Sequence, residues 1–527
     1  MNRHSLRALA AASAVVVASV AGTAATTAVT SATAATPIPT ATGPIATSAT
    51  SHPFGGAAFT LRPQNLGALR YIEEEFFLSG FANVYEWPAP GPAVVRTPDA
   101  PYTTRVLVRR PIDSNKFSGN IIVEPLNPSN LFDLNIGWGL SGDHFVRNGD
   151  VWVGVTVKPV SMVTLKTFDP QRYAPLSLAN PLPLDNPANC ATVAADSSRS
   201  TENGLAWDII SQTGAWLRSD EPSNPLRASA GFRLQNLIAF GYSQTGGYLY
   251  NYINGVHPLE VQRNGGRSLY DAFVVAVAGG GFAGLYPINQ CRPAAPRGDP
   301  RRQFSNVGVP IMHIMSQSDY LRGIDSRRPD GDAPMDRFRH YEMAGAGHAT
   351  PDELYSAAQP ADIVKGGRAV PPMNCNEGPR SRFPSGIHFN AVFQNLDLWL
   401  RRGLPPPYAP FIDVANGQGV VDGFGNVSGG LRSPYVDVPT STWKGASTGP
   451  SFCVIAGHEI PFDAARLRQL YPNEGDYRSK VQQNIARLVR ERFLTPADAL
   501  KLRREANAFM LPPAAGPRDA IDQRSKP

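Results

Sequence analysis

The segment LIAFGYSQTGGYLYNYI (Leu237–Ile253) decides the fold of this 527-residue chain. It begins as a continuous apolar run that ends at Phe240, and it finishes with an apolar helical face marked by Tyr248 and Tyr252. Between the two lies Gly-Tyr-Ser-Gln-Thr-Gly-Gly, with Ser243 near its centre. A strand that turns this sharply into a helix lifts a serine hydroxyl above the end of a sheet. The segment therefore predicts Ser243 as a nucleophile.

The apolar run that starts this segment, Leu234–Phe240, is one of five apolar, β-branched runs of similar length. The others are Gly119–Asn127, Gly149–Lys158, Tyr270–Ala278 and Val309–Met315. Continuous apolar strands are typical of parallel sheets that are covered on both faces. Helical patterns alternate with the runs, so we expect an α/β fold with a mostly parallel central sheet and helices on both faces.

The chain is long for one domain, but long insertions into one α/β core account for the excess. Stretches rich in Pro, Asn or Gly interrupt the pattern and predict cover segments. The expected boundaries are a signal peptide at 1–34, a flexible lead-in at 35–52, one domain at 53–515 with insertions near 159–200, 282–306 and 403–450, and a flexible tail at 516–527.

The beginning of the chain resembles an export signal. A short basic region is followed by an apolar run at 8–22 and by the small residues Ala32-Thr33-Ala34. The alternative is an uncleaved membrane anchor, but the run is shorter than a bilayer-spanning helix. We therefore expect a secreted protein, extracellular or in the cell envelope, with no stable membrane span.

Four cysteines follow the export signal: Cys190, Cys291, Cys375 and Cys453. An even number in an oxidising compartment predicts two disulfides, and the sequence leaves all three pairings open. Buried free thiols are the alternative. No two cysteines are close enough to suggest a zinc site, and we expect no metal and no cofactor.

The net charge and a glycine-rich motif argue against two other classes of protein, those that bind nucleic acids and those that bind dinucleotides. The formal net charge is only +6, and no basic stripe interleaved with aromatic residues occurs, so no nucleic-acid partner is expected. Residues 279–284 match G-x-G-x-x-G, but the sequence after them does not form the helix that a dinucleotide site needs. The sequence says nothing about the oligomeric state.

A serine nucleophile needs a base, and the base needs an orienting acid. Asp319 lies just past the Val309–Met315 strand, and His348 follows a second strand and a small-residue turn. These residues come in the order Ser, Asp, His, which is the order in folds with a nucleophile elbow. We predict Asp319 as the acid and His348 as the base. The alternatives are Asp325 as a reserve acid and His388 as a residue lining the site, while His340 is expected to be structural.

An ester carbonyl also needs donors for the negative charge that develops on its oxygen. The N–H group of Gln244, at the start of the helix after Ser243, is the first expected donor. The second is expected in the loop after the Gly119–Asn127 strand. Pro128 has no N–H group, so Asn127 or Ser129 is predicted.

Several motifs together resemble a bacterial α/β-hydrolase-domain family. They are VEPLNPSN (123–130), GDVWVGVTVKPV (149–160), LKTFDPQRY (165–173), IAFGYSQTGGYLYNYINGVHP (238–258), HYEMAGAGHA (340–349) and the C-terminal YPNEGDYRSKVQQNIARLVRERFLTPADAL (471–500). The resemblance extends over about residues 55–510 and implies the α/β-hydrolase fold and a serine-dependent hydrolase. The chain departs from the strict G-x-S-x-G pattern, because Thr245 occupies the second glycine position.

The sequence thus predicts a secreted hydrolase that cleaves carboxylic esters, small or polymeric, through a Ser-His-Asp triad and an acyl-enzyme. The alternatives are an acyltransferase or an amidase with the same triad, or a catalytically silent binding scaffold.

Overall fold

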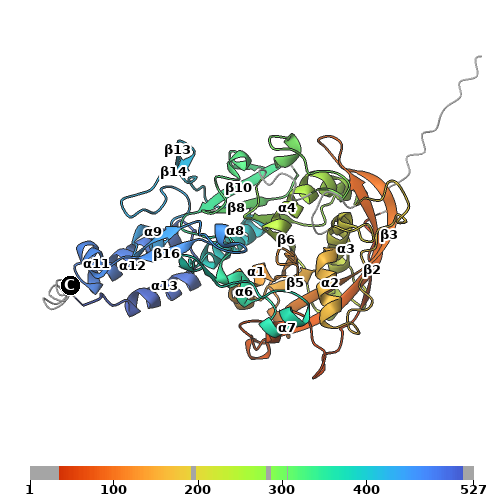
Figure 1. The fold of residues 1–527 in the computed structure, drawn as a ribbon, viewed down its shortest axis with the longest axis horizontal. Coiled ribbons are helices and arrows are strands. Elements are labelled where there is room, and N and C mark those ends of the chain that lie inside the picture. Colours follow the sequence, from red (N-terminus) through yellow and green to blue (C-terminus); the bar gives the residue numbers. More distant parts are fainter. Residues whose placement is uncertain (1–34, 191–196, 280–286, 305–306, 514–527) are drawn as a thin grey trace, which may run out of the picture.

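A ten-stranded sheet runs through the molecule (Figure 1). The computed structural model describes residues 35–190, 197–279, 287–304 and 307–513. The expected signal peptide, the expected tail and most of the 279–284 glycine motif lie outside these residues. In spatial order the strands are β1 (Thr40–Thr42), β2 (Tyr71–Glu86), β3 (Val94–Pro111), β5 (Val151–Val155), β4 (Asn120–Pro125), β6 (Asn236–Tyr242), β7 (Ala272–Ala276), β8 (Ile311–Ser316), β10 (Asp336–Met343) and β9 (Gly331–Ala333).

The central part of this sheet is parallel. β5, β4, β6, β7, β8 and β10 are hydrogen-bonded in that order, and each neighbouring pair runs in the same direction. The five apolar runs of the sequence are β4 to β8, and all five are buried. The prediction of a mostly parallel α/β sheet is confirmed.

Helices cover both faces. The α-helices of the described residues are α1 (Ile136–Asn148), α2 (Pro159–Phe168), α3 (Ala206–Arg218), α4 (Gln244–Asn251), α5 (His257–Arg263), α6 (Pro351–Tyr355), α7 (Pro360–Lys365), α8 (Gly386–Arg402), α9 (Pro434–Asp437), α10 (Cys453–Ala456), α11 (Ala464–Leu470), α12 (Glu474–Arg490) and α13 (Pro496–Ala508). Phe240 of β6 packs against Phe393 of α8, and Phe273 of β7 packs against His257 of α5. Phe273 is in register with Ala239, whose side chain points away from that of Phe240, so α8 and α5 lie on opposite faces.

The long antiparallel strands β2 and β3 were not expected from the sequence. β2 begins with Tyr-Ile-Glu-Glu-Glu, and its run of three glutamates has the pattern of a solvent-exposed segment. In the structure Glu75 is fully buried and pairs with Arg105 of β3, while Glu73 pairs with Arg109. Cross-strand ion pairs therefore replace the apolar alternation that marks an ordinary strand.

Two of the expected insertions contain more regular structure than the sequence suggested. Residues 159–168 form α2, whose Met162, Leu165 and Phe168 are buried in the main core. The 403–450 stretch contains α9 and the short strands β13 (Val414–Ala415), β14 (Gln418–Gly419) and β15 (Ser441–Lys444). β15 pairs with β16 (His458–Pro461), and a further two-stranded ribbon joins β11 (Asn374–Cys375) to β12 (Gly378–Pro379).

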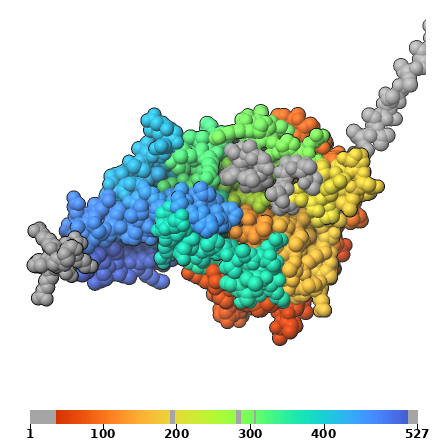
Figure 2. Space-filling view, in the orientation of Figure 1, coloured from red at the N-terminus to blue at the C-terminus, as the bar shows by residue number. Residues whose placement is uncertain are grey.

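The helices α11 to α13 form one end of the molecule (Figure 2). Their buried side chains, including Val481, Ile485 and Leu488, make a second small core with Ile387 of α8. α13 begins with Pro496 in its first turn, and the Thr495 side chain accepts the N–H of Asp498. Among the described residues no helix is both long enough and apolar enough to cross a bilayer.

Candidate active site

Ser243 occupies the sharp turn between β6 and α4. Its backbone has φ 56° and ψ −115°, a conformation that L-residues rarely adopt. The turn is held by hydrogen bonds from Ser243 N–H to Ala276 O and from Gly247 N–H to Ser243 O, both 2.9 Å. The serine side chain therefore projects beyond the carboxyl ends of the central strands, at the start of a helix.

The same turn explains the threonine at the second glycine position. A Cβ on Gly241 would approach Thr245 O to 2.4 Å, and one on Gly246 would approach Ala276 O to 2.7 Å. The close approaches thus require glycine at 241 and 246, and not at 245. Thr245 Oγ1 instead accepts the N–H of Tyr242 at 3.2 Å and closes the turn.

His348 lies directly over Ser243. Its Nε2 is 2.7 Å from Ser243 Oγ, and its Nδ1 is 2.9 Å from each carboxylate oxygen of Asp319. Asp319 follows β8 and is fully buried, and Ser316 Oγ donates a 2.5 Å hydrogen bond to its Oδ2. The structure therefore brings together the three residues that the sequence singled out.

Two remote segments fix the position of His348. The hydroxyl of Tyr242 donates to His348 O at 2.7 Å, and the N–H of His348 donates to Ile455 O at 2.9 Å. Ile455 lies on α10, which the disulfide between Cys375 and Cys453 joins to β11. This disulfide therefore anchors one wall of the site.

The pKa of His348 is raised above its ordinary value of 6.5. Burial alone would lower the pKa, and the neighbouring Arg322 acts in the same direction. The Asp319 carboxylate, by its charge and its hydrogen bond, and the Glu353 carboxylate outweigh them. The arrangement stabilises the imidazolium that forms when His348 accepts a proton.

The loop after β4 does not offer a free N–H group on Asn127 or Ser129, one of which was expected as the second oxyanion donor. Ser129 N–H donates to Asn127 Oδ1 at 2.8 Å, and Asn127 N–H donates to Leu134 O at 3.3 Å. Asn127 also reaches the elbow, because its Nδ2 donates to Tyr242 O at 2.7 Å. Asn127 and Ser129 thus shape the loop, and their N–H groups are already used within it.

Two other donors near Ser243 have no acceptor within the part of the chain that the structure describes. One is the N–H of Gln244, the first of α4, as the sequence suggested. The other belongs to Asn130, whose backbone and side-chain amides are both without an acceptor. Asn130 lines the hollow around Ser243 and His348, together with Phe452 and Ile455. Sequence reasoning did not single it out.

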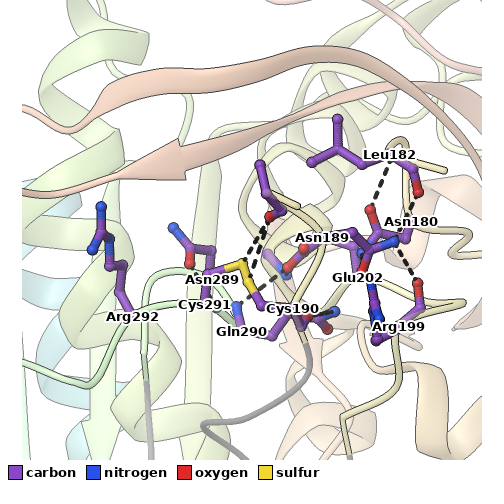
Figure 3. The surroundings of a disulfide bond; sticks show 12 residues. Asn180, Leu182, Asn189, Cys190, Arg199, Glu202, Asn289, Gln290, Cys291 and Arg292 are labelled. Atoms are coloured by element: carbon purple, nitrogen blue, oxygen red, sulfur yellow. Dashed lines mark hydrogen bonds between the residues drawn. A yellow bond between two sulfur atoms is a disulfide. The ribbon is translucent and has the colours of Figure 1, made fainter. Parts of the chain in front are cut away.

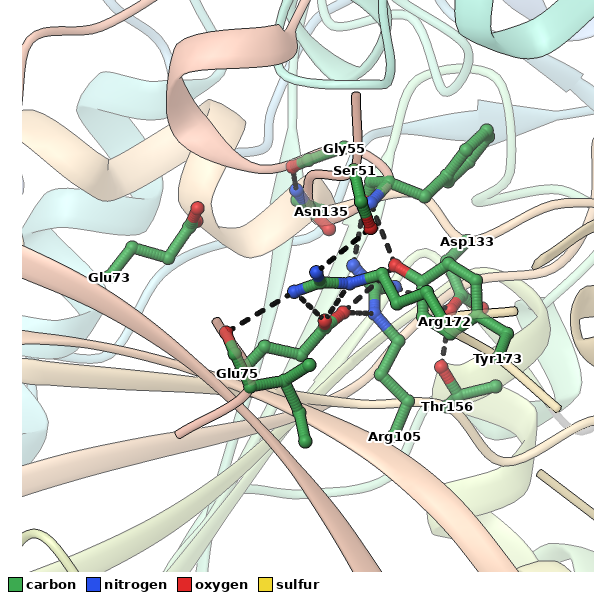
Figure 4. A network of polar contacts seen from close by, with 12 residues as sticks. Ser51, Gly55, Glu73, Glu75, Arg105, Asp133, Asn135, Thr156, Arg172 and Tyr173 are labelled. Atoms are coloured by element: carbon green, nitrogen blue, oxygen red, sulfur yellow. Dashed lines mark hydrogen bonds and ion pairs between the residues drawn. The ribbon is translucent and has the colours of Figure 1, made fainter. Parts of the chain in front are cut away.

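A buried ionic network holds this loop against the sheet (Figure 4). Arg105 donates from Nε to Glu75 at 2.7 Å and from Nη1 to Asp133 at 3.2 Å, and Asp133 lies in the loop. Arg172 donates from Nε to the other oxygen of Glu75 at 2.6 Å. The network contains two cations and two anions, so the loop is anchored without an uncompensated buried charge.

The alternative residues lie elsewhere. Asp325 pairs with the solvent-exposed Arg297 at 3.0 Å. His388 lines a separate hollow beside α12, and burial lowers its pKa to about 4. His340 forms a buried network in which its Nδ1 is 2.9 Å from His313 Nδ1 and its Nε2 is 3.1 Å from Glu342. None of the three lines the hollow around Ser243.

Glu353 of α6 does line that hollow, and sequence reasoning missed it. Its position five residues after His348, in the first turn of a helix, resembles that of an ordinary helix-start carboxylate. Among the described residues, those of this site included, no group of three or more His, Cys, Asp or Glu side chains is arranged to hold a metal ion.

Comparisons with known proteins match the chain to one family. A family model described as "Alpha/beta hydrolase domain" matches residues 41–504. No curated protein matches the chain. Among solved structures, a report on two fungal esterases from Rhizomucor miehei gives 11% identity over 59% of this chain and 83% of that one, with a TM-score of 0.30. The carboxylesterase Cest-2923 from Lactobacillus plantarum gives 10% identity over 54% and 93%, with a TM-score of 0.29.

Proposed function

The chain belongs to the alpha/beta hydrolase domain family, and from this premise we propose that it is a secreted serine esterase. The observation that carries the proposal is the position of one imidazole. His348 lies within hydrogen-bonding distance of Ser243 Oγ on one side and of the buried Asp319 carboxylate on the other. This is the relation that a weak hydroxyl nucleophile needs to its base and that the base needs to its acid.

In the proposed mechanism Ser243 Oγ attacks the ester carbonyl while His348 Nε2 takes the hydroxyl proton. The negative charge on the carbonyl oxygen is stabilised by the N–H of Gln244 and by an amide of Asn130. Collapse of the tetrahedral intermediate breaks the bond to the alcohol, which leaves with the proton held by His348. Water then attacks the acyl-enzyme and gives a proton to His348, and His348 passes this proton to Ser243 Oγ as the carboxylic acid leaves.

The hollow around Ser243 supports a preference for short acyl groups. Its walls include the apolar side chains of Leu134, Phe452 and Ile455. Forcing extra methylenes into a packed wall costs roughly 1–3 kcal/mol. We therefore expect p-nitrophenyl acetate and propionate to have kcat/KM values about ten- to a hundredfold above that of the octanoate.

A panel of these esters with a matched p-nitroanilide tests the function itself. Hydrolysis of the short esters supports the esterase. Cleavage of the anilide alone would support an amidase, and ester products formed with an added alcohol would support an acyltransferase. If none of these compounds were hydrolysed, the result would support a catalytically silent binding scaffold.

The proposed mechanism requires a neutral His348, so kcat/KM falls as His348 becomes protonated. Because Asp319 and Glu353 raise the pKa of His348 in spite of burial and Arg322, we expect the acid limb to have its midpoint above pH 6.5. Activity is thus fully present above the raised pKa and is lost as the pH falls through it. A pH profile of kcat/KM on p-nitrophenyl acetate measures this midpoint. A midpoint well below 6.5 would contradict the assignment of His348 as the base.

Secretion is supported by the cysteines. Cys190 pairs with Cys291 and Cys375 with Cys453, with Cα–Cα distances of 5.3 and 5.6 Å, which leaves no free thiol. The first pair joins two cover segments that are 101 residues apart (Figure 3). Disulfides of this kind persist in oxidising compartments.

A further inference from the structure

Glu353 is a carboxylic acid inside the candidate active site with no role in the mechanism above. It lies on α6 and lines the same hollow as Ser243 and His348. Only 6% of the residue is exposed. A buried carboxyl group normally accepts several hydrogen bonds, and its surroundings therefore decide what it does.

Few polar groups of the described residues contact the Glu353 carboxylate. Its one ion-pair contact is with Nη1 of Arg380, 3.6 Å from Oε1, which is too long for a hydrogen bond. No described side chain or backbone N–H donates to it. Burial raises the pKa of Glu353 to about 7, although the charges of His348 and Arg380 act in the opposite direction.

Glu353 does not replace Asp319 as the acid of the triad. Both oxygens of Asp319 are already 2.9 Å from Nδ1 of His348, and the other ring nitrogen faces Ser243. Neither nitrogen has room for a second carboxylate. Glu353 is therefore free to interact with a molecule that enters the hollow.

We propose that Glu353 binds a hydroxyl group of the substrate, next to the ester that Ser243 attacks. The inference rests on the proposed esterase function and adds the substrate class: short esters that carry a hydroxyl close to the carbonyl, such as esters of hydroxy acids or monoesters of polyols. A buried acceptor without a donor is costly, and a substrate hydroxyl supplies the missing donor when it binds.

Charge favours a neutral hydroxyl over an ammonium group. Arg380 already lies beside Glu353, and its side chain is fully buried with Nε and Nη2 unpaired. A substrate cation would add a second positive charge to this pair, while His348 becomes positive during the reaction.

The test compares substrates that differ by one hydroxyl. Methyl lactate against methyl propanoate places the hydroxyl in the acyl part, and 2-hydroxyethyl acetate against ethyl acetate places it in the alcohol. Hydrolysis of each is followed by titration of the released acid, with wild-type protein, Glu353→Gln and Glu353→Leu. The ratio of kcat/KM within a pair, divided by the same ratio for the variant, cancels the intrinsic reactivity of the esters.

We expect Glu353→Leu to reduce the preference for the hydroxylated member of at least one pair by about ten- to a hundredfold, the range of a hydrogen bond to a charged group. The pair that responds identifies which side of the ester carries the hydroxyl. Glu353→Gln, which keeps an acceptor, should retain part of the preference. Asp352→Asn is the matched control, because this neighbouring carboxylate lines a different hollow.

An equal fall of kcat/KM on both members of both pairs would overturn the proposal and make Glu353 a positioning residue for His348. An unchanged preference in every variant would overturn it as well. Labelling of Ser243 by a fluorophosphonate is measured on each variant, and retained labelling shows that the fold and the triad are intact. If the wild-type protein itself were not labelled, the esterase function on which the inference rests would be refuted.

Discussion

Replacing Ser243 with alanine is expected to lower kcat/KM on p-nitrophenyl acetate on the order of 10⁴- to 10⁶-fold. The proposed acyl-enzyme forms only on Oγ, which lies 2.7 Å from His348 Nε2, so its removal abolishes the covalent route. The measurement is initial-rate hydrolysis over a range of substrate concentrations.

The alanine variant should keep the fold, because the strained turn at residue 243 is held by backbone hydrogen bonds that remain. Its thermal unfolding midpoint is therefore the control and should stay close to that of the wild-type protein. Ser229→Ala, at an exposed serine in the segment before β6 that does not line the hollow around Ser243, should hydrolyse the ester at the wild-type rate. A Ser243→Ala protein with more than a tenth of the wild-type activity would contradict the assignment.

Replacing Asp319 with asparagine is expected to cost about 10⁴-fold in kcat, the size typical of a triad with the wrong imidazole tautomer. Asp319 accepts from Nδ1–H and so leaves Nε2 free to take the serine proton. An asparagine amide turned toward Nδ1 makes that nitrogen the acceptor and moves the ring proton to Nε2, where it blocks the reaction.

The matched control is Asp325→Asn, a second carboxylate in the same region that pairs with exposed Arg297. We expect this variant to keep activity within a few-fold of the wild-type value, since exposed ion pairs contribute little. If Asp325→Asn lost the activity and Asp319→Asn kept it, the choice of acid would be wrong.

The central fold was accessible from sequence because buried parallel strands are continuous apolar runs, and five such runs became β4 to β8. The positions of Ser243, Asp319 and His348 at strand ends, in the right order, were enough to select three residues that the structure brings together. Local pattern and chain order carry this part of the information.

The pairing of segments that lie far apart in the chain could not be predicted from the sequence. β2 and β3 are held by buried Glu–Arg pairs, and a run of glutamates has the pattern of a surface segment until its partner strand is known. The N–H groups of Asn127 and Ser129 are consumed by a loop conformation that depends on Asn127 Oδ1 and Leu134 O. No local motif distinguishes such a loop from one with free donors.

Glu353 and the α10 wall were missed for the same reason. Helix-start carboxylates are common, and only the packing of α6 turns this one into the hollow beside His348. Ile455 reaches His348 from more than 100 residues away, through a segment that the Cys375–Cys453 disulfide holds. The three possible cysteine pairings could not be separated until these segments were placed in space.

The central claim is that Ser243 is an activated nucleophile, and covalent labelling tests it most directly. The full-length protein is incubated with a fluorophosphonate, digested and analysed by mass spectrometry, with Ser243→Ala and Asp319→Asn treated in parallel. We predict one adduct per chain on the peptide that contains Ser243, much slower labelling of Asp319→Asn, and none on the alanine variant. An unmodified Ser243 in folded wild-type protein, or an adduct on a different serine, would contradict the account.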